Sequence, residues 1–288
     1  MNQKPLISII MNCYNSATYL KEAIDSVFAQ TYSNWEIIFW DNQSTDESAE
    51  IFKSYKDKRC QYFYAPEHTT LGEARNLAVM KVSGEWIGFL DCDDIWLPEK
   101  LERQIWVANE YNSKSVIYGK MKLISETHTI NIKRMNKKYE KQVLPSGEIF
   151  LELLKDNFIP LSAGLIYKET YFLVGGISNK YKQAEDYEIF IKIARIFPIY
   201  AIQETLIFYR LHDRNITIKQ AELNYIEALD IIENLKIEGE YPDAKLRWHT
   251  LYILFLFRRL FIIRALSYFF SKGSLLDLIK VFYQSILK

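Results

Sequence analysis

Apolar and polar positions alternate with two distinct periods along the first 112 residues. Four short apolar runs, rich in β-branched and aromatic side chains, predict strands at 6–11, 36–40, 60–64 and 85–90. Apolar residues at helical spacing between these runs predict helices at about 16–28, 45–55, 72–82 and 98–111. Strands that alternate with helices of this length form βαβ units. We therefore expect an α/β fold with a mainly parallel sheet flanked by helices.

The pattern after residue 112 is less regular. Strands are expected at 115–124, 161–167 and 206–211, and a helix at 187–196. The polar and basic residues 125–147 predict a hairpin or a mobile loop. From about residue 216 the pattern is helical almost to the end. We therefore expect one domain over 1–215, followed by a helical extension over 216–288.

Three of the expected strands end in polar side chains: Asn12 after the first, Asp41 after the second and Asp91 after the fourth. In a parallel sheet these ends share the edge at which ligands bind. The motif DCDD places Asp91, Asp93 and Asp94 together there. Such carboxylates suit Mg²⁺ or Mn²⁺, which prefer oxygen ligands and are commonly shared with phosphate groups. The alternative is that Asp94 caps the next helix and the other two are surface acids.

Further residues near this edge are candidates for ligand binding. Asp41 opens the run DNQSTD, where it would accept a hydrogen bond from a base N–H or form an Asx turn. Tyr14 would pack on a base or complete the core. Arg75, on the expected helix GEARNLAV, would pair with a phosphate or carboxylate, or form a salt bridge with a neighbouring Asp. We interpret Asp46 mostly as a helix cap.

Two later motifs carry groups that can transfer a proton or bind a metal. In QAEDYE, Asp186 stands at the start of an expected helix, where it would be a general base or a capping residue favoured by the helix dipole. His212 follows the strand LIFYRL, where it would be a turn residue or a ligand. Arg210 lies just before it.

Composition narrows the classes of function. The 288 residues include 36 Lys plus Arg and 36 Asp plus Glu, so no overall positive charge favours a nucleic acid partner. Three widely spaced cysteines without a C-x-x-C argue against a disulfide framework or a zinc site and for a reducing compartment. No signal peptide precedes the first strand, so we expect a cytoplasmic protein. G-x-G-x-x-G and G-x-x-x-x-G-K-[ST] are absent, which argues against dinucleotide oxidoreductases and P-loop enzymes.

Several motifs in order, over about residues 5–215, resemble the family 2 inverting glycosyltransferases, which have the GT-A fold. The matching stretches are SIIMNCYNSATYLKEAIDSVFAQTYSNWEIIFWDNQSTDES, LGEARNLAV, GEWIGFLDCDD, GGI, AEDYE and YRLHDRN. The resemblance implies a GT-A catalytic domain over 1–215, with a nucleotide-binding half to about 112 and an acceptor half after it.

The resemblance also implies how the donor is bound. Asp41 corresponds to the acid that contacts uracil in a UDP-sugar. Tyr14 and the loop around Asn12 and Asn15 resemble the segment that lines the base pocket. Arg75 resembles the Arg that reaches the donor. One departure is that the usual D-D-G-S-T-D is here DNQSTD, which loses the second acid and the glycine.

The D-x-D motif and the later motifs are implied to hold the metal and the base. Asp91 would face the ribose, and Asp93 would bind the Mn²⁺ or Mg²⁺ that bridges the diphosphate. His212 resembles a late histidine that helps bind the metal or the diphosphate, with Arg210 nearby. Asp186 matches the catalytic base.

Together these assignments imply a metal-dependent inverting glycosyltransferase of the hexosyltransferase type, acting in bacterial surface polysaccharide or glycan assembly. Asp186 would take a proton from an acceptor hydroxyl, whose oxygen would attack the anomeric carbon opposite the leaving nucleoside diphosphate. A sugar nucleotidyltransferase is an alternative, although the loop MNCYNSATYL lacks the Gly-rich, basic character that it needs. A non-catalytic assembly protein that keeps the fold is the other alternative. Cys13 and Cys92, within the motifs, are interpreted as small packing residues.

The C-terminal residues 243–288 combine aromatic and basic side chains. From Lys245 to Lys288 there are eight Lys or Arg and one acid, Asp277. The longest charge-free run is too short to span a bilayer, which needs about 18 apolar residues. Basic and aromatic helices favour an anionic membrane surface, so we expect peripheral association with the inner face of the cell membrane and a lipid-linked saccharide acceptor. The alternative is that these helices pack on the catalytic domain or on a second subunit, as in a homo-oligomer.

Overall fold

The computed structural model describes residues 4–126, 129–215, 220–234, 241–259, 264 and 268. Within them one sheet of eight strands has the order β3-β2-β1-β4-β7-β6-β8-β5. The strands are β1 Ile7–Cys13, β2 Trp35–Asp41, β3 Cys60–Tyr64, β4 Trp86–Phe89, β5 Ile95–Trp96, β6 Val116–Ile124, β7 Leu165–Tyr167 and β8 Ile199–Arg210. The four strands of the first half pair in parallel, as do β6 and β8, whereas β7 and β5 pair antiparallel with their neighbours. The expected α/β fold with a mainly parallel sheet is confirmed.

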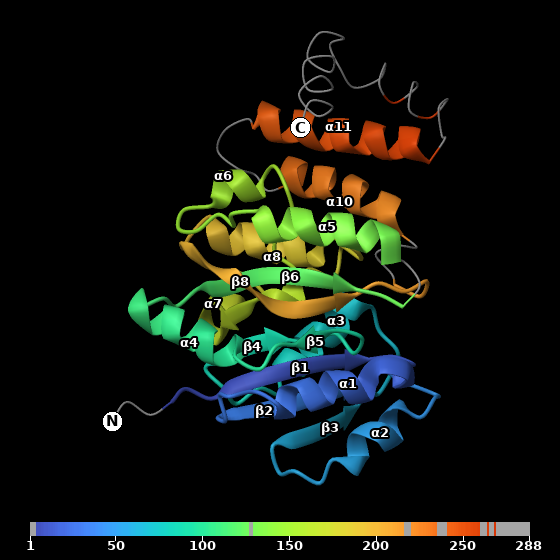
Figure 1. The fold of residues 1–288 in the computed structure, drawn as a ribbon, viewed down its shortest axis with the longest axis vertical. Coiled ribbons are helices and arrows are strands. Elements are labelled where there is room, and N and C mark those ends of the chain that lie inside the picture. Colours follow the sequence, from blue (N-terminus) through green and yellow to red (C-terminus); the bar gives the residue numbers. More distant parts are fainter. Residues whose placement is uncertain are drawn as a thin grey trace.

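Helices cover both faces of the sheet (Figure 1). They are α1 Ala17–Phe28, α2 Ser48–Ser54, α3 Leu71–Val79, α4 Lys100–Glu110, α5 Thr129–Lys141, α6 Phe150–Leu153, α7 Lys168–Leu173, α8 Glu185–Ala194, α10 Ala221–Asn234 and α11 Pro242–Arg258, with a 3₁₀ turn η1 at Leu161–Ala163. Figure 1 shows α10 and α11 beyond α8, at the end of the molecule opposite α1 and α2.

The central strands are buried on both faces, which explains their continuous apolar runs. Ile10 and Ile38 point into a core shared with α3, α8, α10 and α11. Ile9 and Ile37, one position earlier on the same strands, point into a second core shared with α1 and α4. The two faces follow from the alternation of side chains along a strand. The same alternation fixes the register, so the polar residues at the strand ends meet at one edge.

The expectation for residues 125–147 was wrong, because they contain the helix α5. Charged residues dominate this helix, and its buried side chains include both the apolar Ile132 and the polar Asn136. Asn136 Oδ1 accepts a hydrogen bond from Leu123 N at 2.8 Å, and Asn136 Nδ2 donates to Leu123 O at 2.9 Å. The many charged side chains, and an asparagine at one of the buried positions, weaken the apolar periodicity of this helix, so the sequence pattern concealed it.

Other element bounds also differ from the expectation. The strand expected at 161–167 begins as η1, so that β7 is only three residues long. The strand expected at 206–211 starts earlier, at Ile199, because β8 pairs along the length of β6. The two-residue strand β5, which pairs with β8, was not expected.

The described part of the C-terminal extension packs on the rest of the chain. Ala228 and Ile231 of α10 and Trp248 of α11 belong to the same core as α8. Trp248 Nε1 donates hydrogen bonds to Leu154 O at 2.9 Å and to Tyr187 Oη at 3.1 Å. Residues 269–288, part of the expected membrane-binding region, lie outside the described residues.

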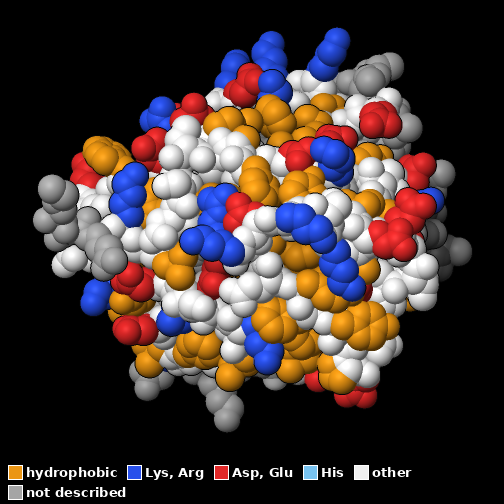
Figure 2. All heavy atoms as spheres, turned by 90° about the horizontal axis from the view of Figure 1, so that it is seen from below, with side chains coloured by type: hydrophobic (Ala, Val, Ile, Leu, Met, Phe, Trp, Pro, Cys, Tyr) orange, Lys and Arg blue, Asp and Glu red, His pale blue; other side chains and the backbone are white. Residues whose placement is uncertain are grey.

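Two further observations bear on possible partners. No helix in the described part of the chain is long and apolar enough to cross a membrane. On the face drawn in Figure 2, basic and acidic side chains are interspersed with apolar ones. This mixture fits the formal net charge of zero.

Candidate active site

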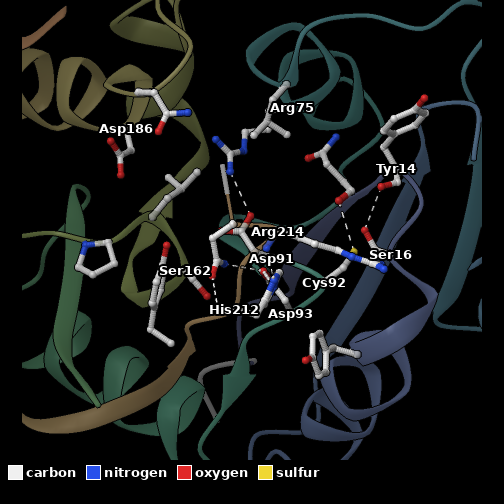
Figure 3. Close-up of a pocket in the computed structure, with 18 of the residues that line it drawn as sticks. Tyr14, Ser16, Arg75, Asp91, Cys92, Asp93, Ser162, Asp186, His212 and Arg214 are labelled. Carbon is white, nitrogen blue, oxygen red and sulfur yellow. Dashed lines mark hydrogen bonds and ion pairs between the residues drawn. The ribbon is translucent and has the colours of Figure 1, made fainter. Parts of the chain in front are cut away.

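A pocket of about 450 Å³ opens at the carboxyl ends of β1 and β4. It is lined by eight of the ten residues expected to form the site: Asn12, Tyr14, Asn15, Arg75, Asp91, Asp93, Asp186 and His212. Figure 3 shows that Tyr14 and Asp186 lie on opposite walls, with Asp91, Asp93 and His212 between them. Segments far apart in the sequence therefore meet around one cavity, as the topology of a parallel sheet dictates.

Asp93 and His212 form the centre of the pocket floor. His212 Nε2 lies 3.0 Å from Asp93 Oδ2, and Asn215 Nδ2 donates to the same oxygen at 3.1 Å. Arg210, at the end of β8, holds the two segments together, because its backbone N donates to Asp94 Oδ1 at 3.1 Å. Asp94 thus fixes the chain instead of facing the pocket.

The donor set fits a divalent cation that a ligand completes. Burial and the charge of Asp91 raise the pKa of Asp93, and the neighbouring His212 lowers it only in part. The surrounding protein therefore does not fully offset the negative charge of the ionised Asp93 carboxylate. Among the described residues no group of three or more His, Cys, Asp or Glu side chains is placed to hold a metal. One or two protein ligands are nevertheless what Mg²⁺ uses when phosphate oxygens and waters supply the rest.

Arg75 joins the acidic motif to the helix that carries Asp186. The side chain is buried on α3, which begins after the capping residue Thr70. Its Nη2 lies 3.0 Å from Asp91 Oδ1, and its Nη1 lies 2.5 Å from Glu185 Oε1. The salt bridge to a neighbouring Asp, one of the two expected roles of Arg75, is therefore present, and the planar guanidinium uses both arms.

Asp186 lies in the first turn of α8, where its surroundings raise the pKa of its carboxyl group. Its Oδ1 accepts hydrogen bonds from Tyr187 N at 2.6 Å and from Asn157 Nδ2 at 3.2 Å. Burial and the neighbouring Glu185 raise the pKa of Asp186 to about 7, against the opposing effect of Arg75. A carboxyl group with this pKa at a pocket wall is suited to general acid–base catalysis.

Of the residues expected to bind the nucleotide base, Asp41 is buried and Tyr14 is exposed. Asp41 is fully buried, and its carboxylate accepts hydrogen bonds from Ser44 N at 2.7 Å and from Tyr62 Oη at 2.6 Å. It therefore forms the turn that was the alternative reading and does not line the pocket. Tyr14, in contrast, is 52% exposed, and its ring lies 4.4 Å from that of His68. Tyr14 lines the pocket, and its ring packs against that of His68.

The loop after β1 is held by side-chain hydrogen bonds. Asn15, with a positive φ of 51°, accepts a hydrogen bond from Thr45 N at 2.8 Å through its Oδ1. Asp46 accepts hydrogen bonds from Ala17 N and from the backbone N of the first residue of α2, both at 3.0 Å, so it caps α1 as well as α2. Asn12 Nδ2 is buried and has no hydrogen-bond partner among the described residues. A buried donor beside the pocket is suited to a ligand acceptor atom.

Arg210 lies beside the main pocket. Its guanidinium donates to Glu22 Oε2 at 2.7 Å and to the carbonyl oxygen of Asp93 at 3.0 Å, and it lies 4.3 Å from the centre of the Tyr19 ring. It lines a neighbouring pocket of about 280 Å³ with Arg214. The structure thus places Arg210 behind the Asp93 segment, where it supports the loop.

Sequence reasoning missed several residues that shape the site. Asn215 lies in the motif YRLHDRN, so its position beside His212 was a usable signal. Asn157 lies in no recognised motif, and only the fold brings it to Asp186. Cys13 and Cys92 are buried, and Cys92 donates to Asn12 O at 3.3 Å, which agrees with their interpretation as packing residues.

Related sequences share most of this chain. An uncharacterized glycosyltransferase of Rickettsia typhi is 35% identical over 230 residues, which cover 79% of this chain and 70% of that protein. The UDP-Glc:alpha-D-GlcNAc-diphosphoundecaprenol beta-1,3-glucosyltransferase WfgD of Escherichia coli is 33% identical over 172 residues, which cover 58% of this chain and 68% of that protein. Three other rickettsial relatives are longer, and the matches cover 34 to 40% of their length.

Solved structures share the fold at low sequence identity. Residues 1–349 of TarS from Staphylococcus aureus, in complex with UDP, match with a TM-score of 0.61 and 19% identity, covering 94% of this chain and 76% of that one. The mannosyltransferase PcManGT from Pyrobaculum calidifontis, in complex with GDP-Man and Mn²⁺, matches with a TM-score of 0.66 and 16% identity, covering 99% and 81%. These matches confirm the GT-A type of fold.

A family model described as Glycosyl transferase family 2 matches residues 8–168, more than half of the chain. The matched region holds β1 to β7 and the acidic motif, and the region after it adds Asp186 and His212 to the same pocket. The chain therefore belongs to glycosyl transferase family 2.

Proposed function

We propose that this glycosyltransferase moves a sugar from a UDP-sugar to an acceptor hydroxyl group, with inversion at the anomeric carbon. The observation that carries the proposal is that one pocket holds both a candidate metal site and a candidate general base, at separate positions. Asp93 and His212 lie at its floor, and Asp186, with a pKa of about 7, lies on its wall. One set suits a diphosphate and its cation, and the other suits a hydroxyl proton.

The donor would be held along the floor of the pocket. Asp93 and His212 would hold Mn²⁺ or Mg²⁺, which offsets the negative charge that grows on the leaving diphosphate. Asp91, paired with Arg75, faces the pocket where the ribose would lie. The exposed ring of Tyr14 gives the base a surface for stacking.

The remaining base contact requires a rearrangement. Asp41 would have to exchange its Ser44 or Tyr62 partner for a base N–H in order to contact uracil. Asn12 Nδ2, which lines the pocket and has no hydrogen-bond partner among the described residues, needs no such exchange. Support for UDP as the nucleotide comes from WfgD, whose name gives UDP-Glc as its donor.

Asp186 performs the proton transfer in this mechanism. Its carboxylate accepts the proton of the acceptor hydroxyl while Asn157 and the Tyr187 N–H hold its other oxygen. The acceptor oxygen forms a bond to the anomeric carbon, and the bond from that carbon to the diphosphate oxygen breaks on the opposite side. UDP leaves with the bonding electron pair, and the single displacement inverts the configuration.

The acceptor and the cellular location are part of the same proposal. WfgD acts on a diphosphoundecaprenol-linked sugar according to its name, which supports a lipid-linked saccharide acceptor here. The basic and aromatic residues 243–288 would then place the chain on the inner face of the cell membrane. Sedimentation of the full chain with vesicles tests this: binding to anionic but not to neutral vesicles supports it, and equal binding to both or to neither contradicts it.

The experiment that tests the reaction is UDP release from a panel of UDP-sugars with Mn²⁺ or Mg²⁺, with and without saccharide acceptors. We expect release from at least one donor in the wild type, and loss of at least about 100-fold in Asp186→Asn. Absence of turnover with every donor would favour a non-catalytic assembly protein. Turnover that Asp186→Asn leaves unchanged would remove Asp186 as the base.

A further inference from the structure

The backbone of the segment that leads into α8 donates hydrogen bonds to a side chain of α10. The residue before the helix is Ala184, which has no polar side chain to cap it. The carboxylate of Glu227 accepts hydrogen bonds instead from three consecutive backbone N–H groups. They are those of Lys182 at 2.9 Å, Gln183 at 2.8 Å and Ala184 at 3.0 Å. Lys182 and Gln183 also line the pocket, so this carboxylate holds part of its wall from behind.

Glu227 is well placed to hold backbone rigidly. Its side chain is buried on α10, and Figure 1 shows α10 next to α8. In the described part of the chain no Lys or Arg forms an ion pair with Glu227, so the backbone N–H groups are the partners that the structure shows for its charge. Hydrogen bonds to an ionised acceptor are short and about twice as strong as neutral ones, which makes this contact a firm attachment.

Three further contacts attach this segment and the first turn of α8 to the C-terminal helices. Asp230, one turn after Glu227, accepts a hydrogen bond from Tyr181 Oη at 2.8 Å and forms an ion pair with Lys180. On the other side of the proposed base, Trp248 of α11 donates to Tyr187 Oη at 3.1 Å. The chain is therefore held by the C-terminal helices both before and after position 186.

We propose that Glu227 is a positioning residue for the transfer reaction, through which α10 fixes the segment that carries the catalytic base. This proposal rests on the proposed function, in which Asp186 takes the acceptor proton. The C-terminal helices then form part of the catalytic unit, in addition to any contact they make with a membrane. The proton acceptor stays in place because a buried carboxylate 41 residues later in the sequence holds the backbone that precedes it.

The effect of Glu227 should be on turnover. A displacement of about 1 Å in a catalytic group can lower a rate about 100-fold. Glu227→Gln keeps the size of the side chain but loses the charge and turns an NH₂ group toward the backbone donors. We expect kcat to fall about 10- to 100-fold. The KM for the donor and the Kd for UDP should change less than about twofold, because the contacts of Asp91 and Asp93 are untouched.

The matched control is Glu233→Gln, the same change on an exposed residue of the same helix. Hydrogen–deuterium exchange supplies a readout that does not depend on activity. The amides of residues 182–184 should exchange faster in Glu227→Gln and at the wild-type rate in Glu233→Gln. If Glu227→Gln does not fold, Glu227→Asp, which keeps the charge on a shorter side chain, gives the same comparison. In Glu227→Asp we expect a kcat below that of Glu233→Gln, an unchanged donor KM and faster exchange at residues 182–184.

Three results would overturn the proposal. One is unchanged exchange at 182–184 in Glu227→Gln, which would show that this carboxylate does not hold the segment. The second is a kcat equal to that of Glu233→Gln. The third is a loss of UDP affinity as large as the loss of kcat. A failure of the proposed function looks different, because Asp186→Asn would then keep wild-type turnover while the exchange result at 182–184 stands.

Discussion

Arg75 and Glu185 form a buried ion pair, with 2.5 Å between Nη1 and Oε1 and 6% of each side chain exposed. The second arm of the guanidinium reaches Asp91 at 3.0 Å. One side chain therefore connects the acidic motif after β4 with the first turn of α8. The other oxygen of Glu185 has no hydrogen-bond partner among the described residues, so its charge depends on Arg75.

Replacing Arg75 should separate its electrostatic role from its bridging role. Arg75→Lys keeps the charge but cannot reach two carboxylates with a planar fork, so we expect kcat to fall about 10- to 100-fold. Arg75→Met leaves Glu185 buried without a counter-charge and should lower the free energy of unfolding by about 3–5 kcal/mol. UDP release and urea unfolding measure the two effects. Arg103→Lys, at an exposed pair with Glu204, is the control. Wild-type kcat in Arg75→Lys would show that bridging is not needed.

The protonation of Asp186 should set the acidic limb of the pH profile. Because the pKa of Asp186 is raised to about 7, the carboxylate is lost as the pH falls through 7, and kcat/KM should fall tenfold per pH unit below it. The charge of Arg75 lowers this pKa, so Arg75→Met should move the limb to higher pH. A profile measured from pH 5 to 9 checks both statements. A limb near pH 4 would contradict them.

The same raised pKa has a consequence for stability. The charged form of Asp186 is disfavoured by folding, so its cost is present above about pH 7 and disappears below the ordinary pKa of 3.8. Asp186→Asn keeps an oxygen for the Asn157 and Tyr187 donors and removes the charge. We expect it to raise the free energy of unfolding by up to about 4 kcal/mol at pH 8 and by nothing at pH 3.5. Urea unfolding at both values measures the difference; a gain that does not vary with pH would refute this account.

Removal of the divalent cation should abolish transfer. In the proposed function Asp93 and His212, which lie 3.0 Å apart, would supply two ligands, so a chelator such as EDTA should remove the ion and added Mn²⁺ or Mg²⁺ should restore activity. Asp93→Asn should raise the metal concentration needed for half-maximal activity at least about tenfold. Asp243→Asn, at an exposed position on α11, should leave it unchanged. Full activity in EDTA would show that the charge of the diphosphate is met by the protein alone.

A buried lysine offers a test of stability away from the pocket. Lys100 is fully buried, donates to Gln104 Oε1 at 2.9 Å and lies 3.8 Å from the Trp96 ring centre. Burial holds the pKa of Lys100 well below its usual value of 10.5. The unfolded chain therefore binds a proton that the folded chain lacks, and stability should rise with pH up to about 10.5.

Lys100→Met should remove this dependence. The variant should be more stable than the wild type at low pH, where the wild type must bury the charge or lose the proton, and the difference should shrink as the pH approaches 10.5. Urea unfolding between pH 6 and 10 measures it, with Lys155→Met at an exposed position as the control. A difference that stays constant over this range would mean that Lys100 keeps its proton in the folded state.

The first half of the fold could be predicted because its strands and helices bury regular apolar patterns. Ile9 and Ile10 lie in opposite cores, so the whole strand is apolar and easy to recognise. The helix α5 was missed because charged residues dominate it and one of its buried positions is the polar Asn136, which joins it to β6 by amide hydrogen bonds. The strand β5 is only Ile95–Trp96, and its pairing with β8 depends on residues more than one hundred positions later.

The site could be predicted as a set of motifs but not as a geometry. Parallel topology explains why the strand ends bring Asn12 and Asp91 together. Asp41 ends its strand in the same way, yet its carboxylate turns to Ser44 and Tyr62, a choice that depends on side-chain packing. The roles of residues outside motifs, such as Asn157, come only from tertiary contacts.

The shared core of the C-terminal helices limits how this chain can be recombined with relatives. Trp248 donates a hydrogen bond to Tyr187, and Ala228 packs in the same core as α8. A crossover between residues 194 and 258 would therefore pack α8 from one parent against helices from the other. Chimeras designed to exchange acceptor preference should therefore carry α8, α10 and α11 from one parent. Library designs that respect this unit should yield more folded, active hybrids than those that cut within it.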